Sequence, residues 1–255
     1  MRIVLKIGGN EIDDPSYLEK VAKLAARIRD DRHQLILVHG GGKEITNLLK
    51  KLNIETKFVK GFRYTDSQSL EAVEMMLSGL INKRLVKALQ RNGVNAIGVS
   101  GVDGKLLVAK RVKRNGEDIG LVGEVEIVNT SLFEKLAKES TVVLSPISVS
   151  NDSSTSLNVN ADYAAAAVAS SLKSDLVIFL SNVQGVLEDG TAIPELDEKE
   201  FLKLRDSNII AGGMVPKIEA ALSALEGGAK KTFVTDTDGA LKLVSGETAG
   251  TRVVA

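Results

Sequence analysis

The sequence predicts an α/β fold with a largely parallel sheet. Short continuous apolar segments, among them residues 3–7 and 34–38, alternate with longer segments whose apolar residues recur at the helical period. Strands that alternate with helices in this way are typical of βαβ units. A chain of 255 residues, 44% of them hydrophobic, can bury a sizeable core in one large domain or two smaller lobes.

The first elements place two glycine turns side by side. In order, we expect a strand at 3–7, a helix from Pro15 to about 30, a strand at 34–38 and a helix at 43–52. The first strand ends at Gly8-Gly9 and the second runs into His39-Gly40-Gly41-Gly42. Both turns should therefore lie at the carboxyl ends of neighbouring strands, where ligands bind in open α/β sheets.

A long helix is predicted from Asp66 or Ser67, either of which can cap it, to about residue 91. Its apolar stripe is wide enough to bury against more than one surface, so a partner subunit could cover part of it. The stripe comprises Leu70, Val73, Met76, Leu77, Leu80, Ile81, Leu85 and Leu89.

The remaining elements continue the alternation. After a strand at 94–100, glycine-containing turns between 103 and 123 indicate short hairpin strands at the edge of the sheet. We then expect a helix at 131–139, strands at 142–144, 176–180 and 232–235, helices at 198–205 and 215–225, and a closing helix and strand up to about 254.

Composition excludes several classes of function. The 33 basic and 33 acidic residues balance, which argues against a nucleic-acid or membrane-surface partner. No cysteine and only two histidines, His33 and His39, leave disulfides, thiol catalysis and ordinary zinc sites without ligands, so no protein metal site is expected. The sequence shows neither a signal peptide nor an apolar segment of membrane-spanning length, and a cytoplasmic location is expected.

A polar stretch precedes the helix expected to open at about Ala161. Asn158, Asn160 and Asp162 alternate, so in an extended chain they would share one wall. The partial positive charge of a helix N-terminus makes such a wall suitable for an anionic ligand. The alternative is that Asn160 or Asp162 simply caps the helix.

Two lysines adjoin the glycine turns. Lys6 interrupts an apolar strand and needs an anionic partner unless it lies at a strand edge, whereas Lys217 follows Gly212-Gly213 and could be a solvated surface residue. A carboxylate such as Asp162 between them would orient both. Two positive charges held in this way could stabilise a transferring phosphoryl group, and glycine turns can either bind phosphate or simply connect elements.

Five motifs together resemble the amino acid kinase family, and within it the branch that phosphorylates N-acetylglutamate. In family order they are Lys6-Ile-Gly-Gly9, Val38-His-Gly-Gly-Gly42, Gly61-Phe-Arg63 with Thr65, Asn158-Val-Asn-Ala-Asp162 and Gly212-Gly-Met-Val-Pro-Lys217. The resemblance covers essentially the whole chain. It implies a three-layer αβα sandwich with a mainly parallel central sheet, in which residues 1–173 bind the acyl amino acid and form a dimer and residues 174–255 bind ATP.

The implied reaction is ATP-dependent phosphorylation of the γ-carboxylate of N-acetyl-L-glutamate, the second step of arginine biosynthesis. The implied cofactor of ATP is Mg²⁺, held mainly by the nucleotide phosphates. Catalytic roles fall by resemblance on Lys6, Lys217 and Asp162. Substrate-binding roles fall on Gly41, Gly42, Arg63, Asn158 and Asn160. Roles in phosphate or ATP binding fall on Gly8, Gly9, Ser181, Asn182, Gly185, Gly212, Gly213 and Met214.

Some features depart from this branch. Asn182 stands where its members usually carry an aspartate, and residues 95–104 also resemble relatives that phosphorylate aminoadipate attached to a carrier protein. More remote alternatives are carbamate, aspartate, glutamate 5- and UMP kinases, and a non-catalytic amino acid or nucleotide sensor on the same fold. We expect a homodimer paired through the helix at 66–91. The family members that arginine inhibits carry an extra helix ahead of the first strand, and here only Met1 and Arg2 precede Ile3. We therefore also expect no inhibition by arginine.

Overall fold

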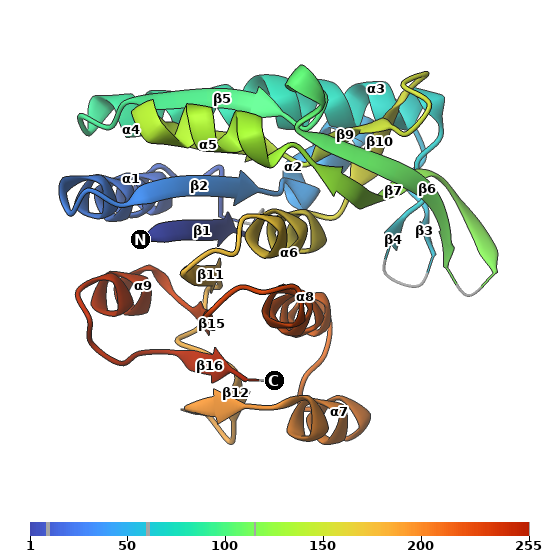
Figure 1. The fold of residues 1–255 in the computed structure, drawn as a ribbon. Coiled ribbons are helices and arrows are strands. Elements are labelled where there is room, and N and C mark those ends of the chain that lie inside the picture. Colours follow the sequence, from blue (N-terminus) through green and yellow to red (C-terminus); the bar gives the residue numbers. More distant parts are fainter. Residues whose placement is uncertain (9–10, 60–61, 115, 255) are drawn as a thin grey trace.

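The computed structural model describes residues 1–8, 11–59, 62–114 and 116–254. Eight strands within these ranges form one sheet in the order β14-β16-β15-β11-β1-β2-β8-β5 (Figure 1). Every neighbouring pair except β15 and β16 is parallel, which confirms the predicted mainly parallel sheet. In chain order these strands are β1 (Arg2–Ile7), β2 (Gln34–His39), β5 (Ala96–Ser100), β8 (Thr141–Ser145), β11 (Leu176–Leu180), β14 (Glu195–Leu196), β15 (Thr232–Thr235) and β16 (Thr251–Val253).

Helices cover both faces of the sheet, so the three-layer sandwich is also confirmed. One buried cluster joins the sheet to α1 (Pro15–Asp30), α2 (Gly42–Lys51), the long helix and α9 (Thr237–Val244). The other joins it to α5 (Thr130–Glu139), α6 (Ala161–Ser171), α7 (Glu198–Asp206) and α8 (Met214–Glu226). Alternation along β1 divides its side chains between them, with Ile3 and Leu5 in the first cluster and Val4 in the second.

The long helix differs from the prediction in its middle turns. Asp66 caps it as expected, by accepting a hydrogen bond from the Ser69 amide. It then passes from α3 (Ser67–Glu74) through a π-helical segment, η1 (Met75–Ile81), into α4 (Asn82–Arg91). The wider π turn shifts the register of the side chains, and Leu80, although part of the predicted apolar stripe, is 51% exposed.

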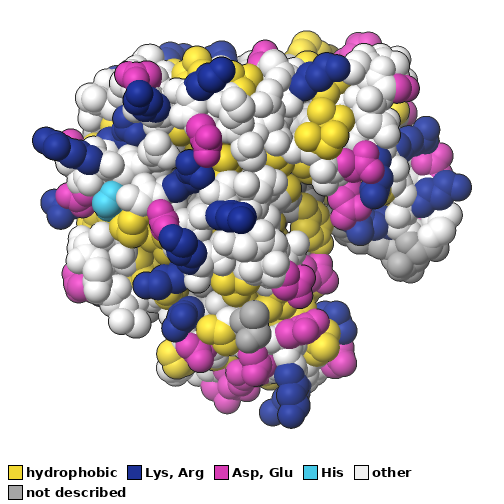
Figure 2. All heavy atoms as spheres, viewed as in Figure 1, with side chains coloured by type: hydrophobic (Ala, Val, Ile, Leu, Met, Phe, Trp, Pro, Cys, Tyr) yellow, Lys and Arg dark blue, Asp and Glu magenta, His cyan; other side chains and the backbone are white. Residues whose placement is uncertain are grey.

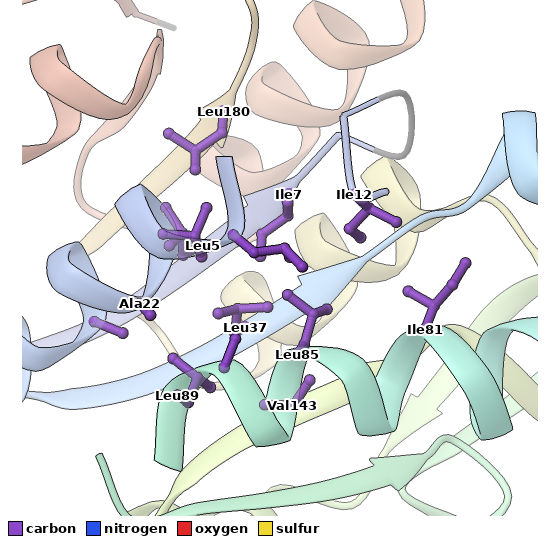
Figure 3. Close-up of a cluster of buried hydrophobic side chains, with 14 of the residues drawn as sticks. Leu5, Ile7, Ile12, Ala22, Leu37, Ile81, Leu85, Leu89, Val143 and Leu180 are labelled. Atoms are coloured by element: carbon purple, nitrogen blue, oxygen red, sulfur yellow. The ribbon is translucent and has the colours of Figure 1, made fainter. Parts of the chain in front are cut away.

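Apart from Leu80, the residues of the stripe are buried, as predicted. Figure 3 shows Ile81, Leu85 and Leu89 in line along one face of the helix, pointing toward the strand residues Leu37 and Ile7. Each of these five side chains is no more than 1% exposed. The long helix is therefore fixed against β1 and β2, the two strands that end in glycine turns.

The hairpin strands expected at the edge of the main sheet lie elsewhere. β6 (Leu107–Arg114) and β7 (Glu117–Val128) form one long hairpin that closes with β9 (Ile147–Ser150) and β10 (Ser156–Val159) into a separate small sheet. Gly120 belongs to β7 with a φ of +76°, and a Cβ there would lie 2.2 Å from the Thr65 carbonyl oxygen. This glycine therefore marks a close contact within a strand, and the expectation of a turn at this position is wrong.

Two short hairpins complete the fold. β3 (Phe58–Val59) pairs with β4 (Phe62–Arg63), and β12 (Leu187–Glu188) pairs with β13 (Thr191–Ala192). The β6–β7 and β3–β4 hairpins project on the side toward which the parallel strands point (Figure 1). The main sheet is continuous across the predicted lobe boundary at position 173, because β1 from the first lobe pairs with β11 from the second. Within the described ranges, no helix has the length and apolar character needed to cross a membrane.

Candidate active site

The candidate site begins with the direction in which Lys6 points. Lys6 is two residues after Val4 on β1, so its side chain faces the same helical layer, the one that contains α6 and α8. Lys6 is only 6% exposed. A buried ammonium requires a counter-charge, and α6 and α8 supply the groups that surround it.

A single carboxylate holds both lysines. Asp162, in the first turn of α6, receives Lys6 Nζ at 2.8 Å and Lys217 Nζ at 3.3 Å on the same oxygen, Oδ1. Burial raises the pKa of the Asp162 carboxyl, but the two ammonium groups outweigh burial and hold it below its usual value. Burial and the neighbouring Lys6 lower the pKa of Lys217 to about 8. The cluster therefore carries two positive charges and one negative charge at pH 7.

The polar wall is shorter than the alternation suggested. Asn158 is in β10 and donates to Thr65 Oγ1 at 3.1 Å, and Asn160 is extended but caps α6 by accepting from the Asp162 amide at 2.8 Å. Asp162 already lies inside the helix. The structure thus assigns the capping role to Asn160 and turns Asp162 toward the lysines.

The two glycine turns follow neighbouring strands, as expected. β1 leads to Gly8, and β2 leads to Gly41 at the N-cap of α2, where no side chain of the described residues caps the helix. A Cβ on Gly42 would meet nothing within 4 Å, so the start of α2 is open. Gly9 lies outside the described residues. The uncapped N–H groups of α2 suit an anionic ligand.

Arg63 lies over the start of α2. Its Nη2 donates to the Gly42 carbonyl at 3.1 Å and to Thr46 Oγ1 at 2.8 Å, and its guanidinium stacks 4.9 Å from the Phe58 ring centre. Its Nη1 is buried and has no hydrogen-bond partner within the described residues. Burial lowers the pKa of Arg63. Thr46 and Phe58 carried no motif in the sequence, because their role comes from the fold placing them beside Arg63.

The remaining predicted residues belong to the second half of the chain. Ser181 and Asn182 follow β11, which is the neighbour of β1 on the side away from β2. Gly213 is the N-cap and Met214 the first residue of α8, the helix that carries Lys217, and within the described part of the chain no side chain caps this end. Gly212 precedes them with a φ of +56°. Gly185 is instead packed against β16, where a Cβ would lie 2.6 Å from Thr251 Oγ1.

These groups converge at one side of the molecule. Figure 2 shows a notch between the projecting β6–β7 hairpin and the part of the molecule below it, on the side toward which the strands of Figure 1 point. On that side β1 and β2 end at their glycine turns. Lys6, which joins the lysine cluster to β1, is the last but one residue of that strand. Preorganised ammonium and N–H groups of this kind stabilise the charge that develops during phosphoryl transfer.

Comparisons with known proteins agree with this geometry. A sequence model described as "Amino acid kinase family" matches residues 1–236. The chain is 42% identical over 248 residues to "Acetylglutamate kinase" of Methanopyrus kandleri, with 94% of this chain and 96% of the relative covered. It is 41% identical over 256 residues to "Acetylglutamate kinase" of Bacillus pumilus, with 99% and 96% covered.

Solved structures share the fold over the whole chain. "The Crystal Structure of smu.665 from Streptococcus mutans UA159" matches with a TM-score of 0.84 and 28% identity, covering 100% of this chain and 98% of that chain. "Carbamate kinase from Giardia lamblia bound to AMP-PNP" matches with a TM-score of 0.70 and 18% identity, covering 99% and 98%. The second likeness concerns the fold only.

Asp162→Asn should lower the free energy of unfolding by about 3–5 kcal/mol at pH 7, because it leaves two buried ammonium groups without their carboxylate. Asp13→Asn is the matched control: Asp13 pairs with Lys43 at the same 2.8 Å, but on the surface, and its loss should cost less than about 1 kcal/mol. Urea denaturation measures both. Equal losses for the two variants would contradict the role of burial.

The pH dependence of this difference has a definite sign. The folded-state pKa of Asp162 is below the unfolded value, so its contribution is fully present above about pH 4, where an unfolded aspartate titrates. The stability gap between wild type and Asp162→Asn should therefore shrink as the pH falls through the lower, folded-state pKa. A gap that widens in acid would contradict the ion pairs.

Proposed function

This chain belongs to the amino acid kinase family, and we propose that it is an enzyme that transfers the γ-phosphoryl group of ATP to the γ-carboxylate of N-acetyl-L-glutamate. The product is the acyl phosphate N-acetylglutamyl 5-phosphate, which belongs to arginine biosynthesis. Relatives of about 40% identity over nearly the full length support the substrate. The observation that carries the reaction type is the buried cluster of Lys6, Asp162 and Lys217.

The reaction needs charge stabilisation more than proton transfer. The acceptor γ-carboxylate is ionised at pH 7, so no general base is required. Two anions must approach each other, and Lys6 and Lys217 would offset that repulsion. Asp162 would hold the two ammonium groups at one place, so that their positions need not change as the phosphoryl group moves.

The other predicted residues divide between the two substrates. We assign the acceptor to Arg63, Asn158 and Asn160 and the phosphoryl group to the amides of Gly41 and Gly42. The unpartnered Nη1 of Arg63 supports a role in binding the α-carboxylate. The nucleotide phosphates would be bound near Gly8, Gly9, Gly212, Gly213 and Met214, and the rest of ATP near Ser181, Asn182 and Gly185. Residues 1–173 would then form the acceptor lobe and 174–255 the nucleotide lobe.

Mg²⁺ would enter with ATP. Asp162 Oδ1 already accepts from two lysines, which makes this carboxylate a poor ligand for a cation. Mg²⁺ commonly keeps several waters and binds substrate phosphates, and this mode fits the donors present. When bound, the metal neutralises phosphate charge, and the lysines would complete that neutralisation.

We also assign the enzyme to the cytoplasm as a homodimer paired through α3, η1 and α4. Met75 and Leu80 on this helix are 59% and 51% exposed, and Ile97 on the edge strand β5 is 37% exposed. Apolar side chains beside a sheet edge are the kind of surface that a second copy covers.

The reaction is tested by trapping the acyl phosphate with hydroxylamine. With MgATP, hydroxamate should form from N-acetylglutamate and not from glutamate, N-acetylaspartate or aminoadipate. Lys6→Ala and Lys217→Ala should each lower kcat by about 10²-fold or more. Lys230→Ala is the control, because Lys230 forms a 2.7 Å pair with Asp175 on the surface, and its kcat should change less than about twofold.

Two outcomes of this test would contradict parts of the assignment, one for the acceptor and one for the lysines. No hydroxamate with any free amino acid, from folded protein that binds ATP, would favour an acceptor attached to a carrier protein. A lysine variant that keeps more than about half of the wild-type kcat would remove that lysine from the catalytic role.

Arg63→Ala should raise KM for N-acetylglutamate by about 10-fold or more and change kcat less, because it removes binding remote from the reacting γ-carboxylate. Arg205→Ala is the matched control, since Arg205 also stacks on an aromatic ring, that of Phe201 at 5.7 Å, but on the surface. Steady-state kinetics distinguish the two. An unchanged KM in Arg63→Ala would place the α-carboxylate elsewhere.

Leu80→Arg should convert the dimer into monomers, because a charge would enter the apolar contact. Leu202→Arg, at a 38% exposed leucine of α7, should leave the dimer intact. Light scattering after gel filtration measures the mass of each. A monomeric wild type at micromolar concentration, or a dimeric Leu80→Arg, would show that this helix is not the interface.

A further inference from the structure

A buried asparagine at the start of α4 is not explained by packing. Asn82 is fully buried, and its Nδ2 donates to the Val143 carbonyl at 2.9 Å and to the Val99 carbonyl at 3.2 Å. The same nitrogen lies 3.3 Å from Nε2 of His39. One amide therefore joins β8, β5 and β2. The cost of burying an amide is compensated here by contacts on three strands.

His39 transmits this contact to the glycine turn. It is the last residue of β2, is fully buried, and its Nδ1 lies 3.1 Å from the Gly40 carbonyl oxygen. Burial lowers the pKa of His39 to about 4, so the ring is neutral at pH 7 and has one donor and one acceptor. The two contacts then fix the tautomer: Nδ1–H donates to Gly40, and Nε2 accepts from Asn82 Nδ2, whose two hydrogens are shared among His39, Val99 and Val143.

The Gly40 carbonyl shares a peptide plane with the Gly41 N–H. Because the peptide unit is planar and trans, the two groups point in opposite directions. A donor that holds the carbonyl on one side therefore also holds the N–H on the other. Gly41 is the N-cap of α2, and its amide is among those assigned above to the phosphoryl group.

The π-helical segment brings Asn82 to this position. A Cβ on Gly41 would lie 2.3 Å from Ile81 Cδ1 and 2.9 Å from Leu77 Cδ2, so η1 packs directly on the turn. A Cβ on Gly98 would lie 2.0 Å from Asn82 Oδ1. A side chain at either glycine would have to displace these residues of the long helix. Figure 3 shows Ile81, the residue before Asn82, at the end of the buried stripe of the helix.

We propose that Asn82 is a positioning residue that acts through His39 to orient the peptide plane between Gly40 and Gly41, and thereby the Gly41 amide that receives the phosphoryl group. This inference rests on the proposed function for the identity of the ligand. The contacts that carry it are independent of that function.

The first test compares Asn82→Ala with Ser78→Ala. Ser78 lies in η1 and loses a 2.9 Å hydrogen bond to Ser145, but it does not touch His39. In the hydroxamate assay, Asn82→Ala should lower kcat by about 10-fold or more and change each KM less than about threefold, because the amide would be misaligned for the transition state. Ser78→Ala should keep kcat within about twofold. Equal effects of the two variants on kcat would overturn the proposal.

A double-mutant cycle tests whether Asn82 acts through His39. In a His39→Asn background, Asn82→Ala should lower kcat less than about twofold, since the link is already broken. Effects that multiply would show that the two residues act separately and would overturn the proposal.

Amide hydrogen exchange gives a readout that does not depend on activity. Asn82→Ala should speed exchange of the Gly40 amide, which donates to the Ile7 carbonyl at 3.4 Å, and Ser78→Ala should not. If the wild type forms no hydroxamate, the proposed function fails, while this measurement still decides the inference. Asn82→Ser replaces Asn82→Ala if the latter does not fold. Failure of both to fold, with Ser78→Ala folded, would show that Asn82 is a residue of the folding core and would overturn the positioning role.

Discussion

The structure of the site depends on one constraint: two buried ammonium groups must share one buried carboxylate. Lys6, Asp162 and Lys217 come from β1, α6 and α8, and each is less than 10% exposed. Such a cluster costs desolvation energy that two ion pairs offset only in part, and it keeps one uncompensated positive charge. An anionic ligand placed beside the cluster would compensate that charge.

Much of this arrangement follows from local sequence. The helical period of the apolar residues predicted the observed bounds of α1. In the structure Asp14 caps this helix and Pro15 is its first residue. Caps and periodicity depend on neighbouring residues, so local sequence can predict them. Alternation along β1 also put Lys6 on one face of the sheet. Local sequence offered Asp162 as a candidate partner of Lys6 but could not place it there, since Asp162 is 156 positions away; the family resemblance supported the pairing, and the fold brings the carboxylate to β1.

The features that the sequence pattern did not predict share a cause. Leu80 fitted the helical stripe, but the π turn that exposes it forms where η1 packs on Gly41 and α4 packs on β5. Glycine is typical of turns, but Gly120 lies within β7 and lets this strand approach the Thr65 backbone closely. Asn82 interrupts an apolar stripe, which was a visible signal, yet its meaning depends on His39, 43 positions away. In each case a tertiary contact overrides a local preference.

The pairing of β1 with β2 explains why the site draws on both helical layers. In this parallel register Lys6 is opposite Val38, and Ile7 is opposite His39. Successive side chains point to opposite faces, so the lysine must reach α6 and α8 while the histidine must reach α4. One layer therefore supplies the charges, and the other orients the backbone of the glycine turn. A slip of one residue between these strands would turn one strand over relative to the other and point Lys6 and His39 into the same layer, so the register of one strand pair determines both halves of the site.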